Sequence, residues 1–204
     1  MLIPRRYGGA GLDALAFAIC VEELAQACAS TAVIVDVHTS VGTEPILLFG
    51  DEEQKRRWLP RLASGELLGA FALTEPASGS DAAALQTTAR RDGDSYVLRG
   101  TKIFITNIGH AGLYVVFART GPDEKAAGVT AFLVPADAPG LRPRLADRRA
   151  HPRGRERAGG QPSWRRGAGL YGRHAGPGLG ANRHLRAGAG HRPGGGRRNA
   201  RVHA

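Results

Sequence analysis

Phe-Ala-Leu-Thr-Glu-Pro-Ala-Ser-Gly-Ser-Asp, residues 71–81, closes an apolar run and then turns abruptly polar. Pro76 has a fixed φ and favours an extended residue before it. We expect Gly79 to adopt a backbone conformation that side chains would block, and Ser80 and Asp81 to hydrogen-bond to nearby backbone groups. The segment predicts a buried strand that delivers a fixed loop rich in hydroxyl and N–H groups. Such a loop is either an ordinary strand-to-turn exit or a binding loop for the polar edge of a ligand.

The sequence on the C-terminal side of this loop alternates between short apolar runs and turn residues. Asp92-Gly93 is a strong signal for a tight hairpin turn between two strands. Short strands at this spacing indicate an antiparallel sandwich or barrel. We expect the strands of this β domain at residues 67–73, 85–89, 95–99, 103–106, 113–118 and 129–134.

The sequence on the N-terminal side has helical periodicity. Asp13 is placed to cap a helix that reaches about residue 29, and Ser30 is placed to cap a second helix over residues 31–42. The second helix is apolar nearly all round, which predicts that it is buried, and we expect its His38 to be structural rather than catalytic. The first helix presents one apolar face, which is made of Phe17, Cys20, Val21, Leu24 and Cys28.

A third helix is predicted just before the strands begin. Asp51 and Gln54 have the spacing of a capping box at its start. Pro60 lies inside this helix and is expected to kink or restart it, because proline has no N–H for the helical ladder. Helices first and strands second make the fold class α+β. We place a partial helical domain at residues 1–65, a middle β domain at 66–144 and a low-complexity tail at 145–204.

The charge of the chain is divided unequally, so the formal net charge of +10 describes neither part. Residues 1–140 contain 12 Lys and Arg against 16 Asp and Glu, whereas residues 141–204 contain 16 Arg against 2 acidic residues. The later part also has 14 Gly and no apolar periodicity, so it cannot bury enough surface to offset the conformational entropy of its backbone. We expect a disordered Arg/Gly-rich tail.

The cysteines and the N-terminus bear on the compartment. Cys20 and Cys28 lie two helical turns apart, so we expect small buried hydrophobes rather than a disulfide. The N-terminus has no signal-peptide pattern, and no run approaches the roughly 18 apolar residues needed to span a bilayer. These features predict a soluble protein without a membrane span in a reducing compartment, which we take to be the cytoplasm.

Three stretches, in order and at matching spacing, resemble segments of the acyl-CoA dehydrogenase family of flavoproteins. The Thr-Glu-Pro-x-x-Gly-Ser-Asp of residues 74–81 is similar to the signature that follows an apolar strand in that family. Pro-Arg-Arg-Tyr-Gly-Gly-Ala-Gly-Leu at residues 4–12 resembles the family's entry loop, and Lys-Ile-Phe-Ile-Thr-Asn at 102–107 resembles its second flavin-contacting segment. Phe104 replaces the usual tryptophan there. The resemblance runs from about residue 4 to about residue 142.

The resemblance implies that FAD lies against the β domain, where the cofactor carries the redox chemistry. Thr74 would point its hydroxyl toward the polar edge of the flavin ring, Phe104 would pack on the ring, and Thr106 would bond near its reactive nitrogen. Ser80 would also contact the thioester arm of an acyl-CoA substrate. The residues that the resemblance implies for binding the cofactor are Phe71, Ala72, Leu73, Thr74, Gly79, Ser80, Phe104, Ile105 and Thr106.

The resemblance also implies an oxidoreductase of fatty acid metabolism, which removes an α-proton and a β-hydride from acyl-CoA. An electron-transfer flavoprotein or a similar acceptor would then take the electrons. A base must be held close to the α-carbon, and the family carries this carboxylate in a C-terminal helical domain that also builds its homo-oligomer interfaces. We find no such domain in this sequence and assign no catalytic residue. We therefore expect a truncated fragment that is inactive alone, and the alternative is a non-catalytic flavin- or acyl-CoA-binding module.

Two explanations of the tail remain open. Arg, Gly, Ala, Pro and His are the residues that GC-rich codons encode out of frame, which favours a frameshifted segment without selected function. The rival is a real Arg/Gly-rich arm that binds nucleic acid electrostatically, but only Trp164 and Tyr171 offer stacking there. The tail histidines are irregularly spaced and have no accompanying cysteines, so no metal site is predicted.

Overall fold

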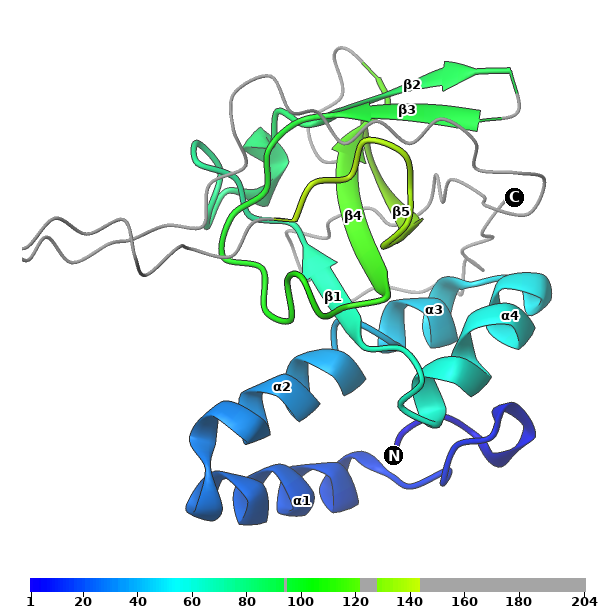
Figure 1. The fold of residues 1–204 in the computed structure, drawn as a ribbon, viewed down its shortest axis with the longest axis vertical. Helices are drawn as coiled ribbons and strands as arrows, with labels where there is room; N and C mark the ends of the chain where they lie inside the picture. The colour runs from blue at the N-terminus through cyan, green and yellow to red at the C-terminus, as the bar shows by residue number, and fades with distance from the viewer. Residues whose placement is uncertain (94, 122–127, 144–204) are drawn as a thin grey trace, which may run out of the picture.

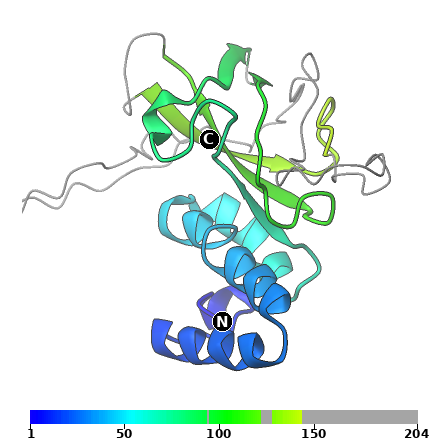
Figure 2. The same ribbon diagram turned by 90° about the vertical axis from the view of Figure 1, so that its left-hand side faces the viewer.

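The computed structural model describes residues 1–93, 95–121 and 128–143. Its α-helices gather at one end of the molecule and its strands at the other (Figures 1 and 2). This arrangement confirms the predicted α+β class, with the N-terminal helical segment before the sheet. The predictions made for residues 145–204 lie outside the described residues.

The order of the elements follows the predicted change from helix to strand. The helical part consists of η1 (Arg5–Tyr7), α1 (Ala14–Ala27), α2 (Ala29–Thr39), α3 (Glu44–Phe49) and α4 (Glu52–Ala63). The second part consists of β1 (Gly69–Ala72), the short η2 (Ala82–Ala84), β2 (Thr88–Asp92), β3 (Ser95–Arg99), β4 (Leu113–Arg119) and β5 (Val129–Pro135).

Two of the three predicted helix caps are confirmed. The Asp13 carboxylate accepts a hydrogen bond from the Ala16 N–H at 2.9 Å. Asp51 and Gln54 form the reciprocal capping box, with the Gln54 N–H donating to Asp51 at 2.7 Å and the Asp51 N–H donating to the Gln54 side chain at 3.2 Å. Each cap satisfies N–H groups that have no partner within the helix. Both helices therefore begin where local side-chain chemistry directs them.

Two local predictions about the helices are wrong. Ser30 is not a cap, because α2 already begins at Ala29 and the extended Cys28 is the residue before it. Pro60 does not restart α4, which runs through it to Ala63. The proline is exposed and lies in the last turn, where the ladder loses only one hydrogen bond and water can solvate the freed carbonyl.

The expectation of a buried second helix is also wrong for this chain. Within α2 only Ala32 and Thr39 are buried, whereas Val33 and Ile34 are 51% and 41% exposed. The helix packs against α1 and β1, and its remaining face is open. An apolar helix face can be predicted from the sequence, but the sequence does not show whether another part of the chain packs against that face.

One helical stretch, Ala29–Phe49, is long and apolar enough by composition to cross a membrane. It joins α2 and α3 across the turn between them and contains polar residues such as Asp36 and Glu44, so it is not an uninterrupted apolar run. Core helices of water-soluble proteins and signal sequences meet the same criterion, so the stretch is a weak indication of a membrane segment.

The described strands form one mixed sheet, in the order β1-β4-β2-β3 with β5 on the other side of β4. β4 pairs with β1 in parallel and with β5 in antiparallel fashion, and β2 meets β4 in parallel at Thr88 and Arg119 alone. The predicted antiparallel sandwich or barrel is therefore wrong for the described residues. The long connection between β1 and β4 brings the chain back to the same end of the sheet, so the two strands can pair in parallel. The alternation of apolar and polar residues does not reveal strand direction.

The predicted hairpin after β2 is confirmed. Asp92 pairs with Ser95, and Gly93 has a φ of +59°, a conformation that glycine adopts without steric cost.

Two apolar clusters hold the molecule together. One lies in the sheet and contains Tyr114, Val116 and Phe132 among its buried members. The other lies among η1, α3 and α4 and contains Ile46, Trp58 and Leu59. Leu113, at the start of β4, belongs to the helical cluster. β4 therefore ties the sheet to the helices and fixes the position of the loops that leave β1.

Candidate functional site

The loop after β1 is a tight turn, as the quoted segment predicts. The Glu75 N–H donates to the Ser78 carbonyl at 2.9 Å, and the Ser78 N–H donates back at 3.1 Å. The Ser78 hydroxyl donates to the Asp81 carbonyl at 2.7 Å, and the Asp81 carboxylate accepts from the Ala83 N–H at 3.1 Å. Asp81 thus bonds locally as expected, and Ser78 rather than Ser80 supplies the local hydroxyl bond.

Gly79 differs from its prediction. It is absent from the glycines with positive φ, and a Cβ built on it would meet nothing within 4 Å. Neither backbone conformation nor packing inside the described chain therefore requires glycine at this position. The residue lies exposed beside Ser80.

Residues 103–106 form an irregular loop rather than the predicted strand. Phe104 has a φ of +56° and is 60% exposed, while its neighbours Ile103 and Ile105 are 4% and 5% exposed. A bulky residue with positive φ is a genuine outlier that the surroundings must hold in place. Asn107, also at positive φ, anchors the loop by donating its side-chain N–H to the Gly69 carbonyl at 3.0 Å. The two buried isoleucines hold the loop so that the aromatic ring between them is exposed.

The two predicted segments, far apart in sequence, lie side by side. The Ile103 N–H donates to the Thr74 carbonyl at 2.9 Å. The Lys102 ammonium donates to the Leu73 carbonyl at 2.9 Å and to the Glu75 carboxylate at 2.7 Å. Three consecutive residues of the first segment therefore accept hydrogen bonds from two consecutive residues of the second.

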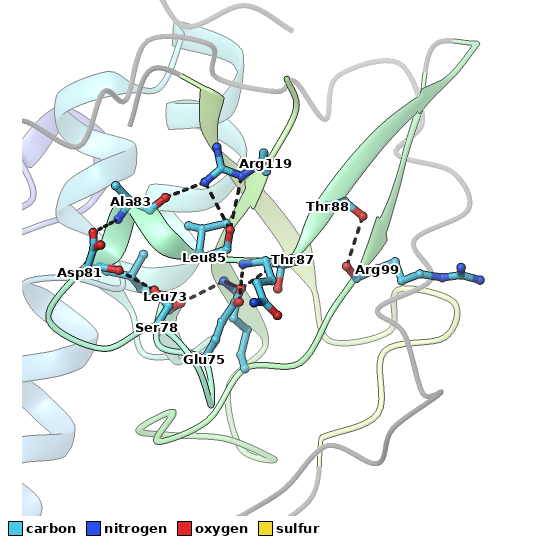
Figure 3. A network of polar contacts seen from close by, with 12 residues as sticks. Leu73, Glu75, Ser78, Asp81, Ala83, Leu85, Thr87, Thr88, Arg99 and Arg119 are labelled. Carbon is cyan, nitrogen blue, oxygen red and sulfur yellow. Dashed lines mark hydrogen bonds and ion pairs between the residues drawn. The ribbon is translucent and has the colours of Figure 1, made fainter. Parts of the chain in front are cut away.

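A buried ion pair lies at this junction. The side chains of Lys102 and Glu75 are 0% and 4% exposed. Glu75 also accepts hydrogen bonds from the N–H groups of Gln86 at 2.6 Å and Thr87 at 2.9 Å (Figure 3). Burial alone would raise the pKa of Glu75, but the hydrogen bonds from Lys102, Thr87 and Gln86 outweigh it, and the pKa lies below its usual value. Burial lowers the pKa of Lys102, and Glu75 offsets this only in part.

Arg119 fastens the loop that supplies these backbone donors to the end of β4. Its guanidinium donates to the Ala83 carbonyl at 2.6 Å and approaches the Leu85 carbonyl at 3.4 Å (Figure 3). Its backbone N–H donates to the Thr87 carbonyl at 2.7 Å. The carboxylate of Glu75 is thereby oriented by a loop that is itself fixed to the sheet.

The hydroxyl and backbone N–H groups of Thr74 and Thr106 are available for a ligand. Both residues are partly buried. Within the part of the chain that the structure describes, neither hydroxyl and neither backbone N–H has a hydrogen-bond partner. Two such donors beside an exposed aromatic ring can bind the polar edge of a flat heterocycle while the ring packs on its face.

The remaining predicted residues have different surroundings. Phe71 lies in β1 and packs edge-on against Phe117, with ring centroids 5.0 Å apart, and Ala72 is buried in the sheet core. Leu73 contributes its carbonyl to Lys102. Among the described residues, no hydrogen bond joins Gly79 or Ser80 to residues 104–106. The structure therefore brings the ends of the two segments together and leaves Gly79 and Ser80 outside that junction.

Sequence reasoning missed the pairing of Lys102 with Glu75 and the role of Arg119. The available signal was a lysine immediately before the apolar run that begins at Ile103, because a lysine drawn into buried surroundings requires a charged partner. No group of three His, Cys, Asp or Glu residues that could hold a metal ion occurs among the described residues.

Comparisons with known proteins point to one family for both the helical part and the sheet part of the chain. Residues 1–66 match the model of the acyl-CoA dehydrogenase N-terminal domain, and residues 70–155 match that of the acyl-CoA dehydrogenase middle domain. The chain is 52% identical over 139 residues to an acyl-CoA dehydrogenase of Bacillus subtilis, covering 68% of this chain and 37% of that protein. It is also 52% identical over 141 residues to the human mitochondrial short-chain specific acyl-CoA dehydrogenase, covering 69% and 34% respectively.

Solved structures give the same result. An acyl-CoA dehydrogenase of Bacillus anthracis complexed with FAD has a TM-score of 0.64 and 41% identity, with 71% of this chain and 24% of that chain covered. A structure described as the electron transferring flavoprotein of Acidaminococcus fermentans has a TM-score of 0.68 and 45% identity, with 70% and 37% covered. The chain spans about a third of the length of the curated relatives it matches.

Proposed function

This chain belongs to the acyl-CoA dehydrogenase family, and from that premise we propose that its described region forms the flavin-contacting part of an FAD-dependent enzyme. The enzyme would be an oxidoreductase that introduces a double bond between the α- and β-carbons of an acyl-CoA thioester. The observation that carries the proposal is the junction of the two loops, where Ile103 donates a hydrogen bond to Thr74 and Phe104 is exposed next to it.

The residues at the junction fit FAD. Phe104 supplies an exposed aromatic face, and Thr74 and Thr106 supply hydroxyl and N–H donors with no partner among the described residues. When bound, FAD accepts the hydride from the substrate, and the protein supplies position and electrostatics. Donors at the polar edge of the ring stabilise the negative charge of its reduced form, because they are already oriented and partly shielded from water.

Gly79 and Ser80 complete the proposed first segment from the outer side of the turn. The space beside Gly79 is open, so a bound cofactor would be the reason for glycine there. We propose that the Ser80 hydroxyl contacts the thioester arm of the substrate. Phe71, Ala72, Leu73 and Ile105 would act by holding the loop backbones, because their side chains belong to the sheet and its surroundings.

Glu75 is not the catalytic base, although it is the carboxylate nearest in sequence to the proposed flavin loop. It is buried and accepts hydrogen bonds from Lys102, Gln86 and Thr87, and its lowered pKa makes it a poor proton acceptor. We therefore assign no base among the described residues. Our proposal is that the 204-residue chain binds flavin but does not turn over acyl-CoA alone, so it would behave as a flavin- or acyl-CoA-binding module.

The remaining parts of the proposal concern partners and location. An electron-transfer flavoprotein or a similar acceptor would reoxidise the flavin, and the complete enzyme would be a homo-oligomer. The free thiols of Cys20 and Cys28 suit a reducing compartment such as the cytoplasm. The nucleic-acid alternative depends on the tail, which is outside the described residues, and no observation favours it.

The test is an FAD titration of the purified full chain, followed by flavin fluorescence and by absorbance in the flavin bands. Thr74→Val and Thr106→Val should each weaken binding about 2- to 10-fold, because a hydrogen bond contributes about 0.5–1.5 kcal/mol. Thr88→Val is the matched control, since Thr88 is an exposed residue of β2 outside both segments. Equal FAD affinity in all four proteins would refute the assignment of the two loops.

A further inference from the structure

We propose that the buried Glu75–Lys102 pair is a positioning device that sets the register between the two flavin-contacting loops. This inference rests on the proposed function and extends it to two residues that touch neither the flavin nor the substrate in that proposal. Lys102 immediately precedes the loop that carries Phe104, and Glu75 immediately follows Thr74. Glu75 therefore lies next to a residue proposed to contact the ring, and Lys102 lies two residues from another.

Hydrogen bonds from the second loop reach Thr74 and both of its neighbours in sequence. The Lys102 ammonium bonds the carbonyl of the residue before Thr74 and the side chain of the residue after it, while the Ile103 N–H bonds the carbonyl of Thr74 itself. A slip of one loop against the other would break all three hydrogen bonds together. The pair thus fixes where the Thr74 hydroxyl lies relative to Phe104, whose positive φ needs a rigid surrounding.

The Glu75 carboxylate is in turn held from a third loop. One oxygen accepts from the Gln86 N–H at 2.6 Å, and the other accepts from the Thr87 N–H at 2.9 Å as well as from Lys102. Arg119 fastens that third loop to the end of β4. A chain of contacts therefore runs from the sheet through Glu75 and Lys102 to both proposed flavin loops.

Stability alone does not account for this pair. Removing two charges from water is costly, and a buried ion pair is often no more stabilising than apolar residues of similar volume. What charged groups add is directional hydrogen bonding with a fixed geometry. A positioning role is consistent with functional sites whose contacting residues are held by a second layer of hydrogen bonds.

The test uses the full 204-residue chain and the variant Lys102→Met. A second variant, Glu75→Gln/Lys102→Met, removes both charges at nearly constant volume and keeps the test decisive if the single variant does not fold. Ile46→Ala is the matched control, because Ile46 is a buried core residue in α3, in the helical cluster away from the loops. Circular dichroism identifies the temperature at which all proteins are folded, and measurements are made there.

Two readouts separate positioning from mere stability. Hydrogen exchange on the FAD-free chain should show lost protection of the Ile103 N–H in the variants but not in Ile46→Ala. FAD titration should show affinity reduced about tenfold or more in the variants and unchanged in the control, as expected when contacting groups are misplaced. If Ile46→Ala loses FAD affinity to the same extent as the two variants, simple destabilisation explains the loss. That result would overturn the proposal.

The two proposals fail in different ways. If the unaltered chain binds FAD and the variants bind it equally well, the positioning role is refuted while the proposed function survives. If the unaltered chain does not bind FAD, the proposed function is refuted. The exchange experiment then decides the register claim alone, and unchanged protection of Ile103 would refute that claim.

Discussion

Substituting Gly79 by alanine separates what the chain needs from what a ligand needs. An added Cβ at Gly79 meets nothing within 4 Å, and the residue does not have a positive φ. The folded chain can therefore accommodate Gly79→Ala without strain. If FAD approaches the backbone at this turn, the same methyl group would occupy space that the cofactor uses.

The expected magnitudes follow from this geometry. Replacing glycine by alanine without strain raises the free energy of unfolding by about 0.4–1 kcal/mol, because the unfolded chain loses conformational freedom. For a chain of about this size, 1 kcal/mol corresponds to roughly 2–4 °C in Tm. FAD affinity should move in the opposite direction and fall about tenfold, which corresponds to about 1.4 kcal/mol of lost binding free energy.

Two control variants make the result specific. Gly121→Ala places a methyl group in equally open space at ordinary φ, away from the proposed loops, and should stabilise the chain slightly without affecting FAD binding. Gly100→Ala would collide with the Thr87 side chain and should lower Tm. The assays are thermal melting by circular dichroism and FAD titration by flavin fluorescence.

Either of two results would contradict the reasoning. A drop in Tm for Gly79→Ala comparable to that of Gly100→Ala would mean that the turn is packed more tightly than described. Unchanged FAD affinity in Gly79→Ala would mean that the cofactor does not approach this glycine, and Gly79 would leave the proposed site.

Three further predictions concern stability. Lys102→Met should cost about 3–5 kcal/mol by leaving the Glu75 carboxylate buried without its ion partner, and Glu75→Gln/Lys102→Met should recover part of that loss in urea unfolding; a cost under about 1 kcal/mol would contradict the burial of the pair. His38 accepts a hydrogen bond from the Gly69 N–H at 2.9 Å and contacts the Leu62 carbonyl at 3.1 Å. Burial lowers the pKa of His38 below the usual 6.5 in the folded chain. Below about pH 6.5 the unfolded chain therefore binds the proton more readily, and the free energy of unfolding falls as the pH drops. This pH dependence should flatten in His38→Gln, as measured by urea unfolding at pH 5 and 7.5. Asp51→Ala should cost about 1 kcal/mol by removing the cap of α4, and an unchanged melting curve would contradict the capping box.

Local features of the fold were predictable from the sequence because nearby residues determine them. Asp13 and Asp51 mark helix starts by side-chain chemistry, and Asp92-Gly93 marks a hairpin through glycine's tolerance of positive φ. His38 was expected to be structural, and its two ring nitrogens have backbone partners. The caps and the hairpin depend on contacts that are short in sequence, whereas the partners of His38 lie 24 and 31 residues away.

Non-local features were not predictable in the same way. Alternation indicates strands but not their direction, so the parallel pairing of β1 with β4 was missed. Ile103 and Ile105 alternate with Phe104 as in a strand, yet the positive φ of Phe104 makes this a loop, because tertiary hydrogen bonds to the loop after β1 outweigh local preference. The burial of Lys102 depends on Glu75, which lies 27 residues away.

The most direct test of the central claim is the change in backbone amide NMR shifts of the full chain on addition of FAD. The account predicts that the non-proline amides of residues 73–80 and the amides of residues 103–106 shift together with one dissociation constant, because a single ring contacts both loops. Shifts confined to one loop would contradict the claim that these two loops form one flavin site. Shifts confined to the hollow over β2 and β3 that Arg90, Arg91 and Arg99 line would contradict it as well.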